Sequence, residues 1–227
     1  MPKRFDVART ELKDQLVAMG EVAKEMIHTA VRALVEREKG LVSEVNRLED
    51  QVDRFQIEID DSAVRLMAMF DPVATDLRFI LMAARINTEL ERIGDQAVNM
   101  CDNVELLLSE PELKKLVDLP RMADIAANMV RASLRAFREG STEKANAVIK
   151  ADEEVDGLND QIFRELLTYM LADAQTIRRS VALILIARAL ERIADHATNI
   201  AEEVIYMVKG EDVRHPEITH SGENSGS

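Results

Sequence analysis

Cysteine, glycine, proline and aromatic residues are all scarce in this chain of 227 residues, and tryptophan is absent. There are one cysteine, eight glycines, five prolines and 4% aromatic residues. A single cysteine, Cys101, excludes an internal disulfide framework and fits a reducing compartment, although a cysteine-poor secreted chain would show the same count. The core must consist of Leu, Ile, Val, Ala and Met, which favours helices over sheets. We interpret Cys101 as a small core residue on a helix.

An excess of positive charge and a long apolar run are also missing. The formal net charge is −13, which repels nucleic-acid phosphates and anionic membrane surfaces, so we expect no nucleic-acid partner. The longest apolar stretch, Val181 to Ala187, is far shorter than the roughly 20 residues that span a bilayer. The residues after Met1 turn polar where a signal peptide needs an apolar region. We therefore expect a soluble cytoplasmic protein with no direct membrane insertion.

Turn residues divide the chain into six long helical segments. We predict helices over about residues 6–39, 42–70, 72–108, 121–139, 142–171 and 173–209. Gly40 and Gly140 are expected to end helices at positive φ, and Pro72 to occupy the first turn of the third helix. Asp173 is a good N-cap for the sixth.

The helical pattern occurs twice. Val52–Asp53 corresponds to Val155–Asp156, Met69 to Met170, Arg78 to Arg178 and Gly40 to Gly140, at offsets of 103, 101, 100 and 100 residues. Near-constant offsets indicate two copies of one unit. We divide the chain into a first bundle at 1–108, a linker at 109–119, a second bundle at 120–210 and a disordered tail at 211–227.

Apolar residues in the third and sixth helices recur at alternating steps of three and four. In the third helix they are Ile86, Leu90, Ile93, Ala97, Met100, Val104 and Leu107, and in the sixth Ile186, Leu190, Ile193, Ala197, Ile200 and Val204. Such stripes are typical of helices that pack nearly parallel in bundles. The sequence therefore predicts an all-α fold of two tandem antiparallel three-helix bundles related by internal duplication.

Beside these stripes, two segments 100 residues apart both read E-R-I-x-D-x-A-x-N. Positions i, i+4 and i+8 stack on one helical face, so each segment presents two carboxylates and an amide oxygen in a row. The residues are Glu91, Asp95 and Asn99 in the first segment and Glu191, Asp195 and Asn199 in the second. One such row is a weak signal, because 42 acids in 227 residues give about eight i,i+4 acid pairs by chance.

A second acidic row faces each of these segments. The pairs are Glu49 and Asp53 in the second helix and Asp152 and Asp156 in the fifth. Residues equidistant from the turn of an antiparallel hairpin lie side by side, and the midpoints of Asp53 with Glu91 and of Asp156 with Glu191 both fall at the predicted turns. The rows should therefore meet at one level in both halves.

Oxygen ligands of this kind favour hard cations such as Mg²⁺, Mn²⁺, Ca²⁺ or iron, and several carboxylates could bridge more than one ion. We predict a carboxylate metal site in each half. Two alternatives stay open: a bundle whose acids are merely solvated, and a metal-dependent enzyme, either a di-iron oxidase or a phosphohydrolase.

Other chemistry-bearing residues give weaker signals. His28 follows Glu25 at the spacing of half a ferritin-like di-iron motif, but the second pair is missing, so we place His28 on a surface or between helices. His196 points away from Asp195 and is expected at a surface or interface. Nucleotide-binding and nucleophile motifs are absent. Four arginines are expected to pair with acids three or four residues away: Arg78, Arg85, Arg178 and Arg188.

The two E-R-I-x-D-x-A-x-N segments, with the P-x-A-x-D-L-R segment at residues 72–78, resemble the PhoU family of phosphate-signalling proteins. The resemblance covers about residues 5–210. The second half departs from it at residues 171–176, where the proline turn is missing, which affects the turn rather than the acids.

The resemblance implies a cytoplasmic negative regulator of phosphate uptake and of the phosphate-starvation response. PhoU-like proteins link a phosphate ABC transporter, through its ATPase component, to a sensor histidine kinase. Members of the family carry multinuclear iron or zinc at the matching acidic rows and are commonly homodimers. We therefore expect a non-enzymatic adaptor that binds iron, zinc, manganese or magnesium.

Overall fold

The computed structural model describes residues 2–210, and every regular element in that range is helical. The predicted tail at 211–227 lies outside the described residues. The elements are α1 (Pro2–Glu36), α2 (Gly40–Phe70), α3 (Ala74–Leu108), α4 (Asp118–Glu139), α5 (Thr142–Ala172), the short 3₁₀ helix η1 (Ala174–Thr176) and α6 (Ile177–Lys209). No helix within residues 2–210 combines the length and apolarity that crossing a bilayer requires.

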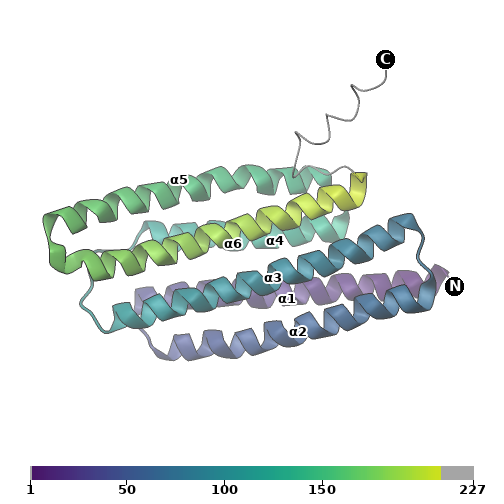
Figure 1. The fold of residues 1–227 in the computed structure, drawn as a ribbon, viewed down its shortest axis with the longest axis horizontal. Helices are drawn as coiled ribbons and strands as arrows, with labels where there is room; N and C mark the ends of the chain where they lie inside the picture. Colours follow the sequence, from purple (N-terminus) through teal and green to yellow (C-terminus); the bar gives the residue numbers. More distant parts are fainter. Residues whose placement is uncertain (1, 211–227) are drawn as a thin grey trace, which may run out of the picture.

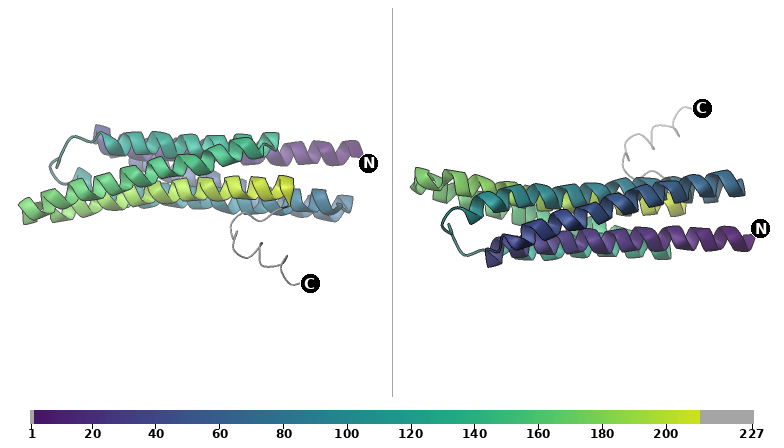
Figure 2. Two further views of the ribbon diagram at one scale, coloured as in Figure 1. Left: turned by 90° about the horizontal axis from the view of Figure 1, so that it is seen from above. Right: turned by 90° about the horizontal axis from the view of Figure 1, so that it is seen from below.

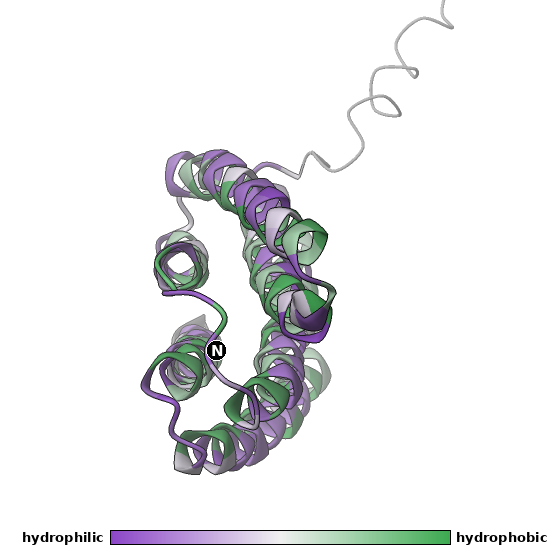
Figure 3. Ribbon diagram, turned by 90° about the vertical axis from the view of Figure 1, so that its left-hand side faces the viewer, coloured by the Kyte–Doolittle hydropathy of each residue, from purple (hydrophilic) through white to green (hydrophobic). Residues whose placement is uncertain are grey.

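The helices form two antiparallel three-helix units, α1–α3 and α4–α6, which lie side by side along their length (Figure 1). Contacts between neighbours define two layers: α2, α3, α6 and α5 form one in that order, and α1 and α4 form the other. Figure 2 shows the elongated shape of this arrangement, and Figure 3 shows the two layers from the end. The predicted all-α fold with two related three-helix bundles is confirmed.

The apolar stripes predicted in α3 and α6 form the centre of the core. Ile86, Leu90 and Ile93 in α3, like Ile186, Leu190 and Ile193 in α6, are 0% exposed. Burial of each such side chain contributes about 2 kcal/mol to folding. The buried residues of both units belong to one continuous cluster, and α3 and α6 contact each other directly. The two repeats therefore share a hydrophobic core.

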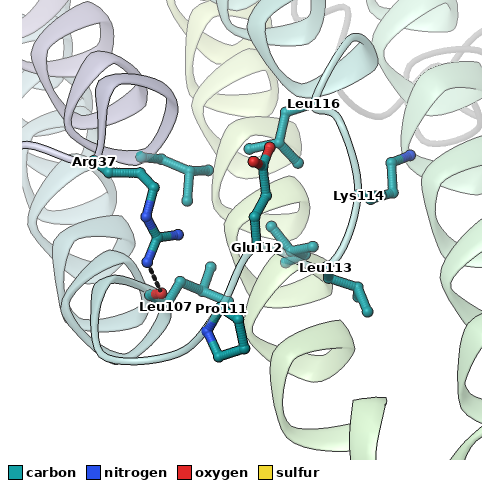
Figure 4. Close-up of a pocket in the computed structure, with 9 residues that line it drawn as sticks. Arg37, Leu107, Pro111, Glu112, Leu113, Lys114 and Leu116 are labelled. Atoms are coloured by element: carbon teal, nitrogen blue, oxygen red, sulfur yellow. Dashed lines mark hydrogen bonds between the residues drawn. The ribbon is translucent and has the colours of Figure 1, made fainter.

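The turn between α1 and α2 differs from the prediction at Gly40. Gly40 is the first residue of α2, and Arg37 adopts the positive φ, 55°, instead. From there Arg37 Nη2 donates a hydrogen bond to the carbonyl of Leu107 at 3.1 Å (Figure 4). It also donates to the carbonyls of Leu108 at 3.1 Å and Glu110 at 2.6 Å. These are carbonyls at and just beyond the end of α3, which lack partners within the helix. The contacts of Arg37 favour its unusual backbone and fix the start of the connection to α4.

The two hairpin turns are built differently. Asp71 ends α2 in the left-handed region at φ 46°, and Val73 precedes the first residue of α3, so Pro72 lies before the helix and not in its first turn as predicted. In the second half, the Asp173 side chain caps as expected, accepting a hydrogen bond from the Gln175 amide at 2.9 Å. The helix that it caps is η1, and α6 follows directly.

Because α3 and α6 cover each other, we predict that the separately produced fragments 1–112 and 117–227 will form a 1:1 complex on mixing. Each fragment alone would expose the apolar face that the other buries. Size-exclusion chromatography with light scattering measures the association.

The interface offers a charge-reversal control. Arg85 in α3 contacts the buried Glu203 in α6 at 3.2 Å, so Arg85→Glu should weaken the complex. Helical fragments that remain separate when mixed would contradict the shared core.

Candidate metal centre

The acidic rows of the second half lie opposite each other on α5 and α6. The pKa of Asp152 is raised to about 6, first by burial and then by the nearby carboxylates of Asp156, Asp195 and Glu191. The pKa values of Glu191 and Asp195 are also raised, first by burial and then by neighbouring carboxylates that include Asp156 on the other helix. Four carboxylates of like charge are therefore concentrated between two helices.

The first half repeats this arrangement on α2 and α3. The pKa of Glu49 is raised by burial, then by Asp53 on its own helix and by Asp95 on the facing one. The pKa of Glu91 is raised by burial and by Asp95, with a further contribution from Asp53 across the hairpin. The structure thus brings the predicted rows of each half together, and their role as metal ligands stays a prediction.

Among the acids of these rows, Asp152 has a carboxylate oxygen that lacks a hydrogen-bond donor in the described residues. Its Oδ1 atom is buried and has no hydrogen-bond partner within the described part of the chain. Its neighbour Glu191 is better satisfied, because Glu191 Oε2 accepts a hydrogen bond from Asn159 Nδ2 at 2.6 Å. A buried carboxylate oxygen without a donor is costly unless a proton or a cation compensates it.

The two asparagines of the rows are placed differently. Asn199 Nδ2 donates to Glu89 Oε2 at 3.0 Å, so this amide is engaged with α3. Asn99 is exposed, and its backbone carbonyl accepts a hydrogen bond from Asn103 at 3.0 Å. The side chain of Asn199 is therefore tied to the contact between the repeats, and that of Asn99 is not.

Donor type and charge fit a hard cation, but the side-chain positions do not yet form a coordination sphere. Within residues 2–210, no three His, Cys, Asp or Glu side chains converge closely enough to hold a metal ion. The acids nevertheless raise one another's pKa values and leave the buried Asp152 Oδ1 unpaired, as expected of a site that gains from positive charge.

Glu89 is a site residue that sequence reasoning missed. Its Oε2 lies 2.7 Å from His196 Nδ1 and accepts the hydrogen bond from Asn199, so three side chains join α3 to α6. Burial would raise the pKa of Glu89, but these hydrogen bonds outweigh it and the pKa is lowered. The position corresponding to Glu89 in the second half is Ala189. This difference between the repeats is the sequence feature that could have indicated a special role for Glu89. His196 lies at an interface, as predicted.

The predicted local partners of the arginines are wrong for Arg85 and Arg178. Arg85 contacts Glu203 on α6, and Arg178 donates to Glu110 after α3 at 3.4 Å, so both join segments distant in sequence. Arg78 lies over the ring of Tyr206, 5.7 Å from its centroid. Charged side chains thus tie the ends of α3 and α6 across the two repeats.

The remaining sequence predictions concern His28 and Cys101. His28 Nδ1 lies 3.6 Å from Asp124 Oδ1 on α4, which confirms its position between helices. Cys101 is a buried residue of the core, as predicted, and burial raises the pKa of its thiol to about 12. A thiol of this kind is a poor nucleophile and a poor metal ligand at neutral pH.

Comparison with known proteins identifies the family. The PhoU domain matches residues 16–104 and again residues 119–204, in agreement with the duplication. The phosphate-specific transport system accessory protein PhoU homologue of Aquifex aeolicus is 39% identical over 94% of this chain and 96% of its own length. The homologue from Pseudomonas putida is 37% identical over 94% of this chain and 84% of its own. The chain belongs to the PhoU family.

Solved structures agree with this assignment. The crystal structure of PhoU from Pseudomonas aeruginosa covers 91% of this chain and 100% of its own, with a TM-score of 0.86 and 35% identity. The phosphate transport system regulatory protein PhoU from Streptococcus pneumoniae covers 92% of this chain and 99% of its own, with a TM-score of 0.84 and 26% identity. The fold is therefore conserved over nearly the whole described chain.

The raised pKa of Asp152 predicts that the metal-free protein loses stability as the pH rises. Its value in the folded protein is about 6, against an ordinary 3.8, so the folded state binds the proton more tightly than the unfolded state. The stabilisation is complete below about pH 4 and disappears as the pH passes about 6. Urea titrations of chelator-treated protein across this range measure the slope.

Asp152→Asn should flatten that slope, because the side chain no longer titrates. Glu153→Gln changes an exposed acid on the same helix and serves as the control, which should keep the wild-type slope. An unchanged slope in Asp152→Asn would show that this carboxyl is not the titrating group.

Proposed function

We propose that this chain is a cytoplasmic negative regulator of phosphate uptake and of the phosphate-starvation response. It acts as an adaptor between a phosphate ABC transporter, which it contacts through the ATPase component, and a sensor histidine kinase, and it works as a homodimer. The observation that carries the proposal is membership of the PhoU family over both repeats. Relatives named as accessory and regulatory proteins of phosphate transport support it.

An adaptor role agrees better with the site than the rival enzymatic role does. Di-iron oxidases of the bundle type use histidine beside carboxylates, whereas His28 lies against Asp124 and His196 against Glu89. The one thiol is buried with a raised pKa. Relatives carry the names of accessory proteins, which supports a function without turnover. Turnover of O₂ with iron, or of phosphoesters, by purified protein would favour the enzyme instead.

We further propose that each half holds metal ions between its acidic rows. Glu49, Asp53, Glu91 and Asp95 would supply the ligands in the first half, and Asp152, Asp156, Glu191 and Asp195 those in the second, with Asn99 and Asn199 beside them. A divalent or trivalent cation such as iron, zinc, manganese or magnesium supplies the positive charge that these rows lack. Carboxylates from α2 and α3, or from α5 and α6, would then hold each hairpin together.

Substitution of one acid in each half separates a metal site from a merely solvated face. If the acids are solvated, Asp95→Asn should change stability by no more than about 0.5 kcal/mol. If they bind metal, Asp95→Asn should lower the metal content of the first half, and the double variant with Asp195→Asn should lose most of the metal. Elemental analysis after removal of loosely bound ions measures the content.

Thermal unfolding gives a second readout of the same variants. Added metal should raise the melting temperature of the wild type, because a ligand bound only by the folded state stabilises it. The gain should shrink in Asp95→Asn and nearly vanish in the double variant, while Glu58→Gln, an exposed acid on α2, should keep it. Equal metal content in wild type and double variant would rule out these rows.

The regulatory proposal predicts a phenotype in cells. A strain that lacks this protein should express phosphate-starvation genes in phosphate-rich medium, because the signal that silences the kinase no longer reaches it. Transcript levels in the deletion strain and in a complemented strain measure this. Normal repression in the deletion strain would refute the regulatory function even if the metal result stood.

A further inference from the structure

One end of the α5–α6 hairpin carries a regular set of exposed apolar side chains, which we call the α5–α6 ladder. Their exposed fractions run from 39% to 80%. The ladder consists of Phe163, Leu167 and Leu171 on α5 and Ile177, Val181 and Leu185 on α6. The spacing is four residues on both helices, or about 6 Å per step along the helix axis. Such a patch is unusual on a helix face that carries acids elsewhere.

The two sides of the ladder lie at matching levels. Hydrogen bonds fix the register on either side of it: Asn159 donates to Glu191 at 2.6 Å, and the Thr176 hydroxyl donates to the Tyr169 carbonyl at 3.0 Å. Between these two bonds the register pairs Phe163 with Leu185, Leu167 with Val181 and Leu171 with Ile177. The six side chains therefore form three apolar pairs along a groove between two antiparallel helices.

The ladder continues the face of the second acidic site. Phe163 lies seven residues after Asp156, and Val181 lies fourteen before Asp195, so these residues share a side of their helices. Of the other helices described, α4 packs against both α5 and α6, whereas α3 packs against α6 but not against α5. The groove between α5 and α6 is thus filled on the α4 side and uncovered along the ladder.

Positive charge surrounds the ladder in a chain that is strongly acidic. Residues 161–188 contain four arginines and two acids, a local charge of +2, whereas the chain carries −13. Arg178 directly follows Ile177, Arg188 lies about one turn after Leu185, and Arg164 adjoins Phe163. Arg164 is exposed and contacts Asp160, through an ion pair at 3.5 Å and a hydrogen bond from Nε to the carbonyl at 3.2 Å. Arg178 is already paired with Glu110, whereas the exposed Arg164 and Arg188 are available to carboxylates of a partner.

The equivalent end of the first half has an interrupted apolar set and no excess of positive charge. Residues 58–88 contain five acids and three arginines, a local charge of −2. Val64, Leu77 and Leu81 are exposed there. The third level differs, because Arg85, bound to Glu203, takes the place of Leu185, and Asp60, bound to Asn87, takes that of Phe163. The two ends have therefore diverged in the surface that they offer.

We propose that the α5–α6 ladder binds an amphipathic helix of a partner protein, with apolar residues on one face and acidic residues on both flanks. A helix fits the groove because residues at i, i+4 and i+8 on it reproduce the three levels of the ladder. Acidic flanks meet the arginines and provide specificity. This inference names a partner surface and so rests on the proposed adaptor function.

Fluorescence anisotropy with a labelled synthetic helix of about four turns tests the proposal. The probe has Leu on one face and Glu on the flanks, and a second probe replaces Glu by Lys. Measured with chelator present, the Glu-flanked probe should bind at least about tenfold more tightly. The double variant Val181→Gln, Leu185→Gln should weaken its binding by about tenfold or more.

Two further variants keep the result interpretable. Leu77→Gln with Leu81→Gln removes apolar residues of 39% and 48% exposure from the first half, close to the 42% and 45% of Val181 and Leu185, and should leave binding unchanged. Arg164→Glu with Arg188→Glu should shift the preference toward the Lys-flanked probe. Circular dichroism verifies folding of each variant.

Equal binding of the two probes, or retained binding in the Val181→Gln, Leu185→Gln variant, would overturn the proposal. A preference for anionic phosphatidylglycerol vesicles over the Glu-flanked probe would also overturn it, since the occupant would then be a lipid surface. So would a dimer in sedimentation that only the ladder variant loses, since the occupant would then be a second copy of the chain. The probe experiment is done in vitro and the deletion strain tests regulation in cells, so either can fail without the other.

Discussion

The contact between α3 and α6 is the interaction on which the rest of the structure depends. Each repeat places its most completely buried helix there, and neither α3 nor α6 could keep its apolar face from water inside one three-helix unit. The same contact orders α2, α3, α6 and α5 in one layer, which places the two acidic sites in hairpins that lie side by side with their turns at opposite ends (Figure 1). Polar ties at its edges, Glu89 with His196 and Arg85 with Glu203, fix how far the repeats slide past each other.

Concentrated negative charge opposes this packing at two places. Four carboxylates face one another in each hairpin, and the raised pKa values of Glu49 and Asp152 indicate that their ionised forms are disfavoured. Evolution retains such an arrangement when a bound ligand relieves the repulsion or when the charges have another use.

Sequence reasoning could predict the fold because its signals were local and repeated. Periodicity of three and four gave the stripes of α3 and α6, and duplication allowed each element to be checked against its counterpart. The prediction for Gly40 was wrong because Arg37 adopts the positive φ instead. Arg37 donates hydrogen bonds to three carbonyls about 70 residues later in the chain, which the sequence pattern could not indicate. The partners of Arg85 and Arg178 were also beyond prediction, since both are long-range contacts across the repeats.

The candidate site shows the same limit in a different form. The spacing from the hairpin turn was enough to predict that the acidic rows face each other. Asn99 and Asn199, however, occupy the same position of the motif, and only the fold shows that Asn199 is bound to Glu89. The α5–α6 ladder could not be predicted from the sequence, because apolar residues at a spacing of four are also typical of a buried helix face. What distinguishes them is the absence of a covering helix within the described chain.

Divergence between the repeats therefore carries more information about function than their similarity does. The acids are retained in both halves, so both hairpins are under the same chemical constraint. Glu89 against Ala189, and Arg85 against Leu185, differ where the halves meet each other or meet solvent. In the first half both residues are used for internal contacts with α6, whereas in the second half Leu185 is left exposed beside arginines. A duplicated protein of this kind can keep two equivalent acidic sites and still present a different surface at each end.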